Sequence, residues 1–319
     1  MFTGIFNKIQ EKQPSILVLG DLMLDRFIFG TVNRISPEAP VPIVKLKKEE
    51  QMLGGCGNVI RNLDNLGIKS LLCSIVGQDL AGDILIDQLK EKEIPISNIL
   101  RLENIRTTEK MRIVADRQQI VRVDWDMNDL AAGFSDNLIK YITEQVKYID
   151  GIIVSDYAKG VCSEILLKKI IKISNENNIP ILVDPKGADW RKYQDATLIT
   201  PNIKEAEAVV GKTLEKDEDF ELAGGKICSA FNIESCLITR GGDGMSFFGK
   251  NNTFHLRSNA KEIFDVSGAG DTVISAMAAG LSIDLSYREA AEFSNQAAGI
   301  VVGHIGTTAI TIEELLNLN

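Results

Sequence analysis

Residues 265–271 read DVSGAGD, and residues 272–281 continue as the apolar stretch TVISAMAAGL. The apolar stretch predicts a buried helix that begins on the small residues 267–270. Unpaired backbone N–H groups and the positive end of the helix dipole meet at such a terminus, and glycines let an anion come close to it. Asp271 would lie in the first helical turn and could accept a proton from an attacking hydroxyl. The alternative is a tight turn before a helix that happens to begin with an Asp.

Short β-branched runs alternate with amphipathic stretches through most of the chain. The runs predict buried parallel strands at residues 16–20, 152–155, 181–184, 197–200 and 237–239, with helices at 163–175 and 217–231. This alternation predicts an α/β fold with a doubly wound, mostly parallel sheet flanked by helices. Ligands of such sheets bind at the carboxyl ends of the strands.

Two segments depart from this alternation. Residues 26–50 are rich in proline and alternate like exposed strands, and residues 107–126 read as two strands joined by a polar turn. We expect both to form a small β-sheet lid over the main sheet. No repeat or linker divides the chain, so we expect a single domain over residues 1–319.

The composition narrows the class of function. The 319 residues carry a net charge of −9, which argues against nucleic-acid binding, and two histidines with five scattered cysteines argue against a zinc cluster. The N-terminal residues lack the apolar core of a signal peptide, and no apolar run approaches the roughly 20 residues of a membrane helix. We therefore expect a cytoplasmic protein that binds no membrane.

Two more segments follow predicted strands. TRGGDG, residues 239–244, could border a nucleotide or could be a simple hairpin turn. In TPNIKEAE, residues 200–207, Asn202 and Glu205 have the spacing of a capping box. The same two side chains could instead lie near magnesium-bound phosphates, and the local sequence leaves both interpretations open.

The N-terminal part offers candidates for polyol recognition. Asp21 follows the first strand and Asp25 begins the lid, while LGGCGNVIRNL at residues 53–63 places Gly54, Gly55 and Asn58 at a second helix start. Carboxylates and amides beside a glycine-lined pocket suit sugar hydroxyls. A cap cluster with a strand-end Asp would be the structural alternative.

Two lysines stand beside aspartates on the expected ligand edge. Lys159 lies in SDYAKG and Lys186 in VDPKG, each after a predicted strand. A phosphate-facing role and an ordinary solvated position are both compatible with the sequence. The chain contains no GxxxxGK[ST] motif, so phosphoryl transfer here would not use a Walker-type loop.

Taken together, these segments resemble the ribokinase-like (PfkB-type) sugar kinases. The family's two signatures are matched by LGGCGNVIRNLDNLG at residues 53–67 and by DVSGAGD. The resemblance covers nearly the whole chain and is most specific in the lid segment. GDLMLDRFIFGTVNRISPEAPVPIV, RQQIVRVD, SDYAKGV, VDPKG, TPN and SNQAAGIVVGHIGTTAIT are similar to the branch of the family that phosphorylates D-glycero-β-D-manno-heptose 7-phosphate.

The resemblance implies a role for each matching residue. Asp271 would be the base, and the backbone N–H groups of Gly268, Ala269 and Gly270 would form the anion hole. The sugar positions are Asp21, Gly54, Gly55 and Asn58, and Asp265 matches a position where many relatives bind K⁺. The implied positions around ATP are Asn202 and Glu205, which orient Mg²⁺ through water, together with Thr239, Gly241, Gly244 and Asn295.

This sequence departs from the family pattern at two places. The glycine motif reads GGCGN where close relatives carry two alanines, so Cys56 and Gly57 are expected to loosen that helix start. NIKE replaces the commoner NLSE, which puts Lys204 on the nucleotide side. Both departures concern affinity rather than the type of reaction.

The implied reaction transfers the γ-phosphoryl group of ATP to the anomeric hydroxyl, giving the heptose 1,7-bisphosphate for ADP-heptose and lipopolysaccharide core synthesis. A carboxylate of ordinary pKa near 4 would suffice as base, because the hydroxyl keeps its proton until late in a loose transition state. The alternatives are another sugar kinase, acting on a fructose phosphate, ribose or a nucleoside, and a non-catalytic sensor of sugar phosphate and nucleotide.

An anionic acceptor needs cations away from the transferred phosphate. The candidates are Arg34, Lys110, Arg112, Arg122, Lys159 and Lys186, which the sequence alone does not rank. The apolar alternation of the lid permits a homodimer. Because the chain shows no GxFDxxHxGH-type motif, we expect a stand-alone kinase without a nucleotidyltransferase domain, followed in the pathway by a separate nucleotidyltransferase and a phosphatase.

Overall fold

A nine-stranded sheet forms the body of the molecule. The computed structural model describes residues 2–116, 118–127, 133–250, 252–260, 266–304, 306 and 308–317. The strand order in the main sheet is β13-β12-β11-β10-β9-β8-β1-β4-β5. Neighbouring strands from β11 to β5 are parallel, whereas β12 runs antiparallel to both of its neighbours, β11 and β13. The strands of this sheet are β1 Ser15–Gly20, β4 Lys69–Gly77, β5 Ile99–Leu102, β8 Gly151–Ser155, β9 Ile181–Asp184, β10 Leu198–Ile199, β11 Ser235–Thr239, β12 Met245–Gly249 and β13 Thr253–Leu256.

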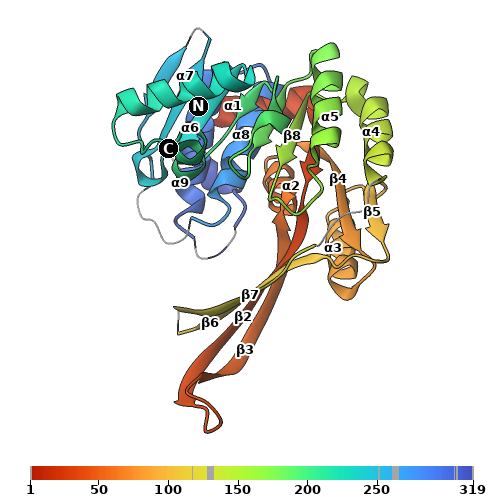
Figure 1. The fold of residues 1–319 in the computed structure, drawn as a ribbon, viewed down its shortest axis with the longest axis vertical. Helices are drawn as coiled ribbons and strands as arrows, with labels where there is room; N and C mark the ends of the chain where they lie inside the picture. Colours follow the sequence, from red (N-terminus) through yellow and green to blue (C-terminus); the bar gives the residue numbers. More distant parts are fainter. Residues whose placement is uncertain are drawn as a thin grey trace.

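Helices cover both faces of this sheet (Figure 1). Successive side chains of β1 show why, because Ile16 and Val18 belong to one hydrophobic cluster while Leu17 and Leu19 belong to the other. The first cluster is covered by α1 Phe2–Lys12, α2 Cys56–Asn65, α3 Leu80–Glu91, α8 Ala269–Ser282, α9 Tyr287–Val301 and α10 Ile312–Leu316. The second is covered by α4 Phe134–Gln145, α5 Glu164–Glu176, α6 Ile203–Val210 and α7 Asp217–Phe231.

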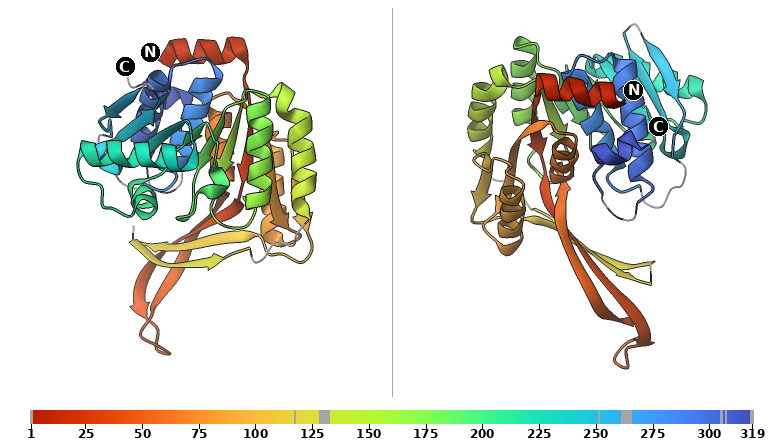
Figure 2. Two further views of the ribbon diagram at one scale, coloured as in Figure 1. Left: turned by 45° about the horizontal axis from the view of Figure 1, so that its top comes forward. Right: turned by 180° about the vertical axis from the view of Figure 1, so that it is seen from behind.

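A four-stranded sheet of order β3-β2-β6-β7 projects from the body as the lid (Figures 1 and 2). Its strands are β2 Leu22–Ile35, β3 Pro42–Gly55, β6 Thr108–Ala115 and β7 Gln118–Trp125. The chain passes from β1 into β2 through one residue, Asp21, and from β3 directly into α2. The bases of β2 and β3 therefore lie at the carboxyl edge of the main sheet, where ligands of α/β folds bind.

The expected doubly wound sheet with a lid is confirmed. The lid strands reach beyond the predicted segment 26–50 at both ends, because the buried bases of β2 and β3 continue the pairing. Helix α1 and strands β4, β5, β12 and β13 were not among the predicted elements. Within the described residues, no helix is long and apolar enough to cross a membrane.

Candidate functional site

A cavity of about 540 Å³ lies at the carboxyl edge of the sheet. The loops after β8, β9, β10 and β11 line it together with the start of α8 and one face of α9. An isolated bridge between Asn202 and Thr239 holds two of these loops side by side. The residues predicted from sequence that line the cavity are Lys186, Asn202, Glu205, Thr239, Gly241, Gly244, Gly268, Ala269, Gly270, Asp271 and Asn295.

Helix α8 begins as the sequence predicts. Gly268 is its N-cap residue and adopts the left-handed conformation with φ of 81°, and Asp271 lies in the first turn. Most of α8 is buried from Asp271 onward, and Gly268, Ala269 and Gly270 at its start line the cavity. This arrangement suits an anion at the helix start.

Asp271 is buried, with 3% of its surface exposed. Asn58 Nδ2 donates a hydrogen bond to Asp271 Oδ2 at 2.9 Å, and the Tyr157 hydroxyl donates to Asp271 Oδ1 at 2.9 Å. Burial raises the pKa of Asp271 to about 6 even though both hydrogen bonds lower it. The expected ordinary pKa near 4 is therefore wrong, because the sequence does not show how completely α8 buries this carboxyl group.

Tyr157 is a site residue that the sequence analysis missed. It follows the strand-end Asp156 in SDYAKG, and it lines the cavity as well as contacting Asp271. Its position directly after a predicted strand is the signal that could have identified it.

Asp21 holds the loop that carries Tyr157. Its carboxylate accepts hydrogen bonds from the backbone N–H groups of Tyr157 at 2.8 Å, Lys159 at 3.1 Å and Val161 at 3.0 Å. Only 1% of Asp21 is exposed, and it does not line the cavity. These contacts give Asp21 a role in shaping the loop, and they do not support its predicted contact with a sugar hydroxyl.

Asp25 instead presents its carboxylate at the base of the lid. Arg112 Nη1 lies 2.5 Å from Asp25 Oδ1, and both side chains are mostly buried. A Cβ at Gly54 would lie 2.2 Å from Asp25 Oδ2, so only glycine leaves room for this carboxylate. Gly55 has φ of 58°, and a Cβ there would lie 2.3 Å from the carbonyl oxygen of Asp21. The two glycines therefore let the lid base and the start of α2 approach each other closely.

The GGCGN departure fits the local packing. Cys56 is fully buried as the first residue of α2, and a Cβ at Gly57 would lie 2.8 Å from Leu22 Cδ1 and from Leu53 Cβ. A second alanine would be crowded here, so the glycine is compatible with an ordered helix start. The expected loosening is not seen, since α2 begins at Cys56 itself. Lys204, the other departure, lines the mouth of the cavity and is exposed.

The structure shows Asn202 and Glu205 as a capping box, and both residues also line the cavity. Asn202 Oδ1 accepts from the Glu205 N–H and Glu205 Oε2 accepts from the Asn202 N–H, each at 3.0 Å, which is a complete capping box. The remaining oxygen, Oε1, lies 2.9 Å from Lys186 Nζ. The cap thus fixes Glu205 in place at the cavity.

Asp184 lies beside the anion site. A Cβ on Gly270 would lie 3.9 Å from Asp184 Oδ2. Burial raises the pKa of Asp184 well above its ordinary value, and the negative charges of Asp271 and Glu205 raise it further. Among the described residues, no three His, Cys, Asp or Glu side chains are arranged to hold a metal ion.

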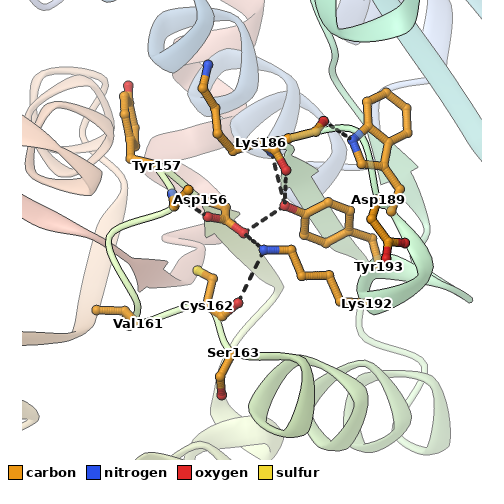
Figure 3. A network of polar contacts seen from close by, with 12 residues as sticks. Asp156, Tyr157, Val161, Cys162, Ser163, Lys186, Asp189, Lys192 and Tyr193 are labelled. Atoms are coloured by element: carbon orange, nitrogen blue, oxygen red, sulfur yellow. Dashed lines mark hydrogen bonds and ion pairs between the residues drawn. The ribbon is translucent and has the colours of Figure 1, made fainter. Parts of the chain in front are cut away.

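A buried polar network fixes the loop that carries Lys186 (Figure 3). The Tyr193 hydroxyl donates to Asp156 Oδ2 at 2.7 Å and accepts from the Lys186 N–H at 3.0 Å. Lys192 Nζ also pairs with Asp156. In Figure 3 the side chain of Lys186 extends away from this network, while its backbone is anchored to it. The network therefore fixes the backbone from which the Lys186 side chain reaches Glu205.

The segment TRGGDG is both a hairpin turn and a wall of the cavity. It joins β11 to β12, with a short 3₁₀ turn at Gly241–Asp243. Gly244 has φ of 97°, and a Cβ there would lie 2.0 Å from the Leu256 carbonyl oxygen. Asn295, on α9, donates from Nδ2 to the Arg257 carbonyl oxygen at 2.7 Å and so contacts the chain just after β13.

The structure separates the six candidate cations. Arg34 and Arg122 are exposed on the lid, and Arg122 pairs with Asp124. Lys186 belongs to the cavity wall with Glu205. The other three lie near the base of the lid: Arg112 paired with Asp25, Lys159 paired with Asp126 at 2.6 Å, and Lys110 with its Nζ 5.2 Å from the centre of the Tyr157 ring.

Lys110 is the member of this group without a carboxylate partner within 4 Å among the described residues. Burial lowers its pKa, and this effect outweighs the negative charge of Asp25, which raises the pKa; the charges of Lys159 and Arg112 lower it as well. One nearby cation that the sequence analysis missed is Arg61 on α2, whose Nη1 lies 3.4 Å from Asn58 Oδ1. Asp265, the predicted K⁺ position, lies outside the described residues.

Comparisons of sequence agree with this geometry. The sequence profile of the pfkB family of carbohydrate kinases matches residues 13–314. A curated protein of Actinobacillus succinogenes, "Bifunctional protein HldE", is 42% identical over 309 residues, which are 97% of this chain and 64% of that protein. The protein of the same name from Haemophilus influenzae strain KW20 is 42% identical over 307 residues, covering 96% of this chain and 63% of that protein. The chain thus spans a little less than two thirds of the length of these relatives.

Solved structures show the same fold. A structure of Arabidopsis thaliana ribokinase complexed with ribose and ATP superimposes with a TM-score of 0.76 at 17% identity, covering 96% of this chain and 98% of that one. Escherichia coli phosphofructokinase-2 in complex with potassium gives 0.78 at 20% identity, covering 95% and 97%. At such identities the likeness concerns the fold alone, which is ribokinase-like.

Proposed function

The chain belongs to the pfkB family of carbohydrate kinases and is an ATP-dependent sugar kinase, and from this premise we propose that its acceptor is D-glycero-β-D-manno-heptose 7-phosphate. The phosphoryl group would go to the anomeric hydroxyl, giving the 1,7-bisphosphate. A relative that this chain matches over 64% of that protein's length is called bifunctional, and we propose the kinase activity for this chain. The lid segments similar to heptose phosphate kinases favour the kinase activity.

The observation that carries the proposal is the group of cations at the base of the lid. This group consists of Lys110, Arg112 and Lys159. Lys110 lies directly over the ring of Tyr157, and the hydroxyl of that tyrosine contacts Asp271. Arg112 and Lys159 are each paired with a carboxylate, so Lys110 is the cation of this group that an anionic ligand could pair with directly. A neutral sugar would leave the Lys110 ammonium without a close ion pair, whereas a sugar phosphate would pair with it.

The residues of this chain account for the proposed chemistry. In this proposal Asp271 would accept the proton of the attacking hydroxyl, and the N–H groups at the start of α8 would stabilise charge on the transferred phosphoryl group. The lid would exclude water from the sugar and limit hydrolysis of ATP. In such a site a positioned base contributes about 10²–10⁴ in rate.

The cavity also fits Mg²⁺–ATP. Its glycine-lined walls after β11 and at α8 allow a nucleotide to approach the backbone, and the carboxylates of Asp184 and Glu205 face the same space. Two carboxylates without a third ligand suit a Mg²⁺ ion that keeps most of its water and binds phosphates. Bound Mg²⁺ would neutralise charge on the phosphates. We retain K⁺ at Asp265 as part of the proposal.

The wider assignments follow from the same proposal. We propose that residues 1–319 act as one kinase domain in the cytoplasm, as a homodimer that associates through the lid. A nucleotidyltransferase and a phosphatase would complete ADP-heptose synthesis downstream.

A panel of acceptors tests the substrate. Purified protein with Mg-ATP is assayed for ADP release with the heptose 7-phosphate, fructose 6-phosphate, ribose and no sugar, and Asp271→Asn serves as the background control. We expect Asp271-dependent release that is strongest with the heptose phosphate. Strong release with another sugar would keep the kinase chemistry and overturn the acceptor. Binding of the ligands without any release would favour a sensor.

A lid variant tests the phosphate contact. We expect Lys110→Met to raise KM for the sugar phosphate about 10- to 100-fold, as for the loss of one charged contact, while KM for ATP stays unchanged. Arg122→Met, which removes an exposed lid cation paired with Asp124, is the matched control. An equal effect of the two substitutions would show that lid charge in general, and not Lys110, attracts the acceptor.

A further inference from the structure

Both oxygens of the Asp271 carboxylate accept a hydrogen bond. Asn58 Nδ2 donates to Oδ2, and the Tyr157 hydroxyl donates to Oδ1, each at 2.9 Å. Asn58 was expected at the site as a sugar ligand, whereas nothing in the assigned roles accounts for a phenol on the base. The hydrogen bond from Tyr157 to Asp271 is therefore a contact without an assigned function.

Two contacts limit the position of this tyrosine, one at its backbone and one at its ring. Its backbone N–H donates to Asp21 Oδ2 at 2.8 Å, and the same carboxylate holds the N–H groups of Lys159 and Val161. Lys110 Nζ covers the ring at 5.2 Å. The neighbouring Asp156 turns to the network around Tyr193, and the side chain of Tyr157 points away from that network (Figure 3). These contacts support the orientation of Tyr157 in which its hydroxyl donates to Asp271.

A phenol that donates to a carboxylate has two effects. It fixes the orientation of the carboxylate, and it stabilises the ionised form that can accept a proton. A carboxylate oxygen has two lone pairs, so Oδ1 can accept from Tyr157 and still receive the proton of an acceptor hydroxyl. Tyr157 can therefore support the base without occupying its place.

We propose that Tyr157 is a positioning residue of the phosphoryl-transfer reaction, whose hydroxyl orients the Asp271 carboxylate and keeps it ionised near neutral pH. This inference rests on the proposed function for the role of Asp271 as the base. Tyr157 also connects the lid to Asp271, because Lys110 on β6 contacts the ring of this tyrosine.

Several charged groups act on Asp271 from the elements around it. Burial raises its pKa, and the negative charge of Asp25 on β2 raises it as well, whereas Lys110 on β6 lowers it. The other titratable groups coupled to Asp271 are Cys56 and Arg61 on α2, Asp184 at the end of β9 and Tyr157 itself. The substitution Tyr157→Phe leaves these groups in place and removes one hydrogen bond, so its effect on the base can be isolated.

The dependence of kcat/KM on pH provides the test. We expect the acidic limb of Tyr157→Phe to move up by about one pH unit, the size expected for one hydrogen bond to a charged group. Activity would then be about fivefold below wild type at pH 6 and close to it at pH 9. Tyr193→Phe, which removes a buried hydroxyl from Asp156 instead, is the matched control and should leave the acidic limb in place. Tyr148→Phe, at an exposed residue away from the site, should match wild type throughout.

A second readout does not depend on turnover. In protein with ¹³C-labelled aspartate, the carboxyl resonance that is missing in Asp271→Asn identifies the base. We expect its titration midpoint to rise by about one pH unit in Tyr157→Phe. An unchanged or lower midpoint would overturn the inference, as would a loss of activity that is equal at all pH values. If Asp271→Asn remained active, the role of Asp271 in the proposed function would fail instead, and the two failures are thus distinguishable.

Discussion

At the scale of single residues, Asp271 combines a functional advantage with a cost in stability. A carboxyl group with a pKa of about 6, against its ordinary 3.8, holds its proton in the folded chain over a pH range where the unfolded chain has lost it. Ionisation therefore disfavours the folded state as the pH rises through 6, and this cost is absent below 3.8. The proposed base is thus a group whose charged form lowers the stability of the fold.

The substitution Asp271→Asn tests this trade-off. We expect turnover to fall at least about 100-fold, because a positioned base is lost. The free energy of unfolding at pH 8 should rise by roughly 1–3 kcal/mol, since the buried charge is removed and two pKa units correspond to nearly 3 kcal/mol. Urea unfolding measures the gain, which should shrink as the pH is lowered from 6 to 4. A loss of stability at pH 8, or a gain that does not vary with pH, would contradict the account.

Glycine at position 54 is the second constraint at this scale. Gly54→Ala would place a methyl group 2.2 Å from Asp25 Oδ2, so the carboxylate and its partner Arg112 would have to move. We expect KM for the acceptor to rise by about 10- to 100-fold, with little change in KM for ATP. Steady-state kinetics with each substrate varied in turn would show this.

Gly225→Ala is the matched control. Gly225 lies in α7, and a Cβ there meets nothing within 4 Å. Alanine favours a helix over glycine by about 1 kcal/mol, so this variant should be at least as stable and fully active. Equal kinetic effects of the two alanines would refute the role of the close approach at Gly54.

At the scale of elements, the sequence predicted helices and strands well where local signals and packing agree. Helix α7 was predicted with its observed bounds of 217 and 231, and left-handed Asn232 follows it as the C-cap. Strand β9 was also predicted at 181–184. The antiparallel strands β12 and β13 were missed because the glycine-rich turn before them is compatible with either a nucleotide loop or a hairpin. It turned out to be a hairpin that also lines the cavity.

The capping box of α6 places a functional carboxylate, so its two oxygens can be tested separately. Glu205→Gln keeps an oxygen for the Asn202 N–H but removes the charge beside Lys186. We expect little change in Tm and a several-fold higher Mg²⁺ concentration for half-maximal activity, because a charged ligand position becomes neutral. Activity measured over a range of Mg²⁺ concentrations would show whether the charge of Glu205 contributes to Mg²⁺ binding.

The control is Asn202→Ala, which removes the other half of the box. It should cost about 1 kcal/mol of stability, as for the loss of an N-cap side chain. If Glu205→Gln changed stability and left the Mg²⁺ dependence unaltered, Glu205 would be a capping residue only.

At the scale of the whole molecule, the lid projects from the carboxyl edge of the main sheet (Figure 1). Its strand β2 begins just after β1 and its strand β3 leads into α2, while the far end of the lid exposes Ile35, Val41 and Leu46, which are 60%, 51% and 58% exposed. Apolar side chains gathered on a projecting sheet favour association with a second surface. The proposed dimer would bury them.

Leu46→Asp tests this association. We expect wild-type protein to elute as a dimer in size-exclusion chromatography with light scattering, and Leu46→Asp to elute mainly as a monomer. Leu222→Asp, on helix α7 at 70% exposure, should leave the dimer intact. A monomeric wild type, or a dimer that both aspartates leave unchanged, would exclude association through the lid.

The candidate site was predicted less completely than the fold. The residues of the two glycine motifs and of the capping box are local patterns, and the sequence identifies them. The contact between Asn58 and Asp271 joins residues 213 positions apart, and the contact between Tyr157 and Asp271 spans 114. Such meetings depend on the strand order of the sheet. The roles of Asp21 and Tyr157 and the pKa of Asp271 therefore became visible only in the folded chain.

The position of the new phosphate is the most direct test of the central claim. ³¹P NMR of protein incubated with Mg-ATP and D-glycero-β-D-manno-heptose 7-phosphate would follow the products. The account predicts a second phosphate monoester resonance on the sugar, coupled to the anomeric proton, that appears with ADP and is absent with Asp271→Asn. A phosphate on another carbon, or inorganic phosphate released in its place, would contradict it.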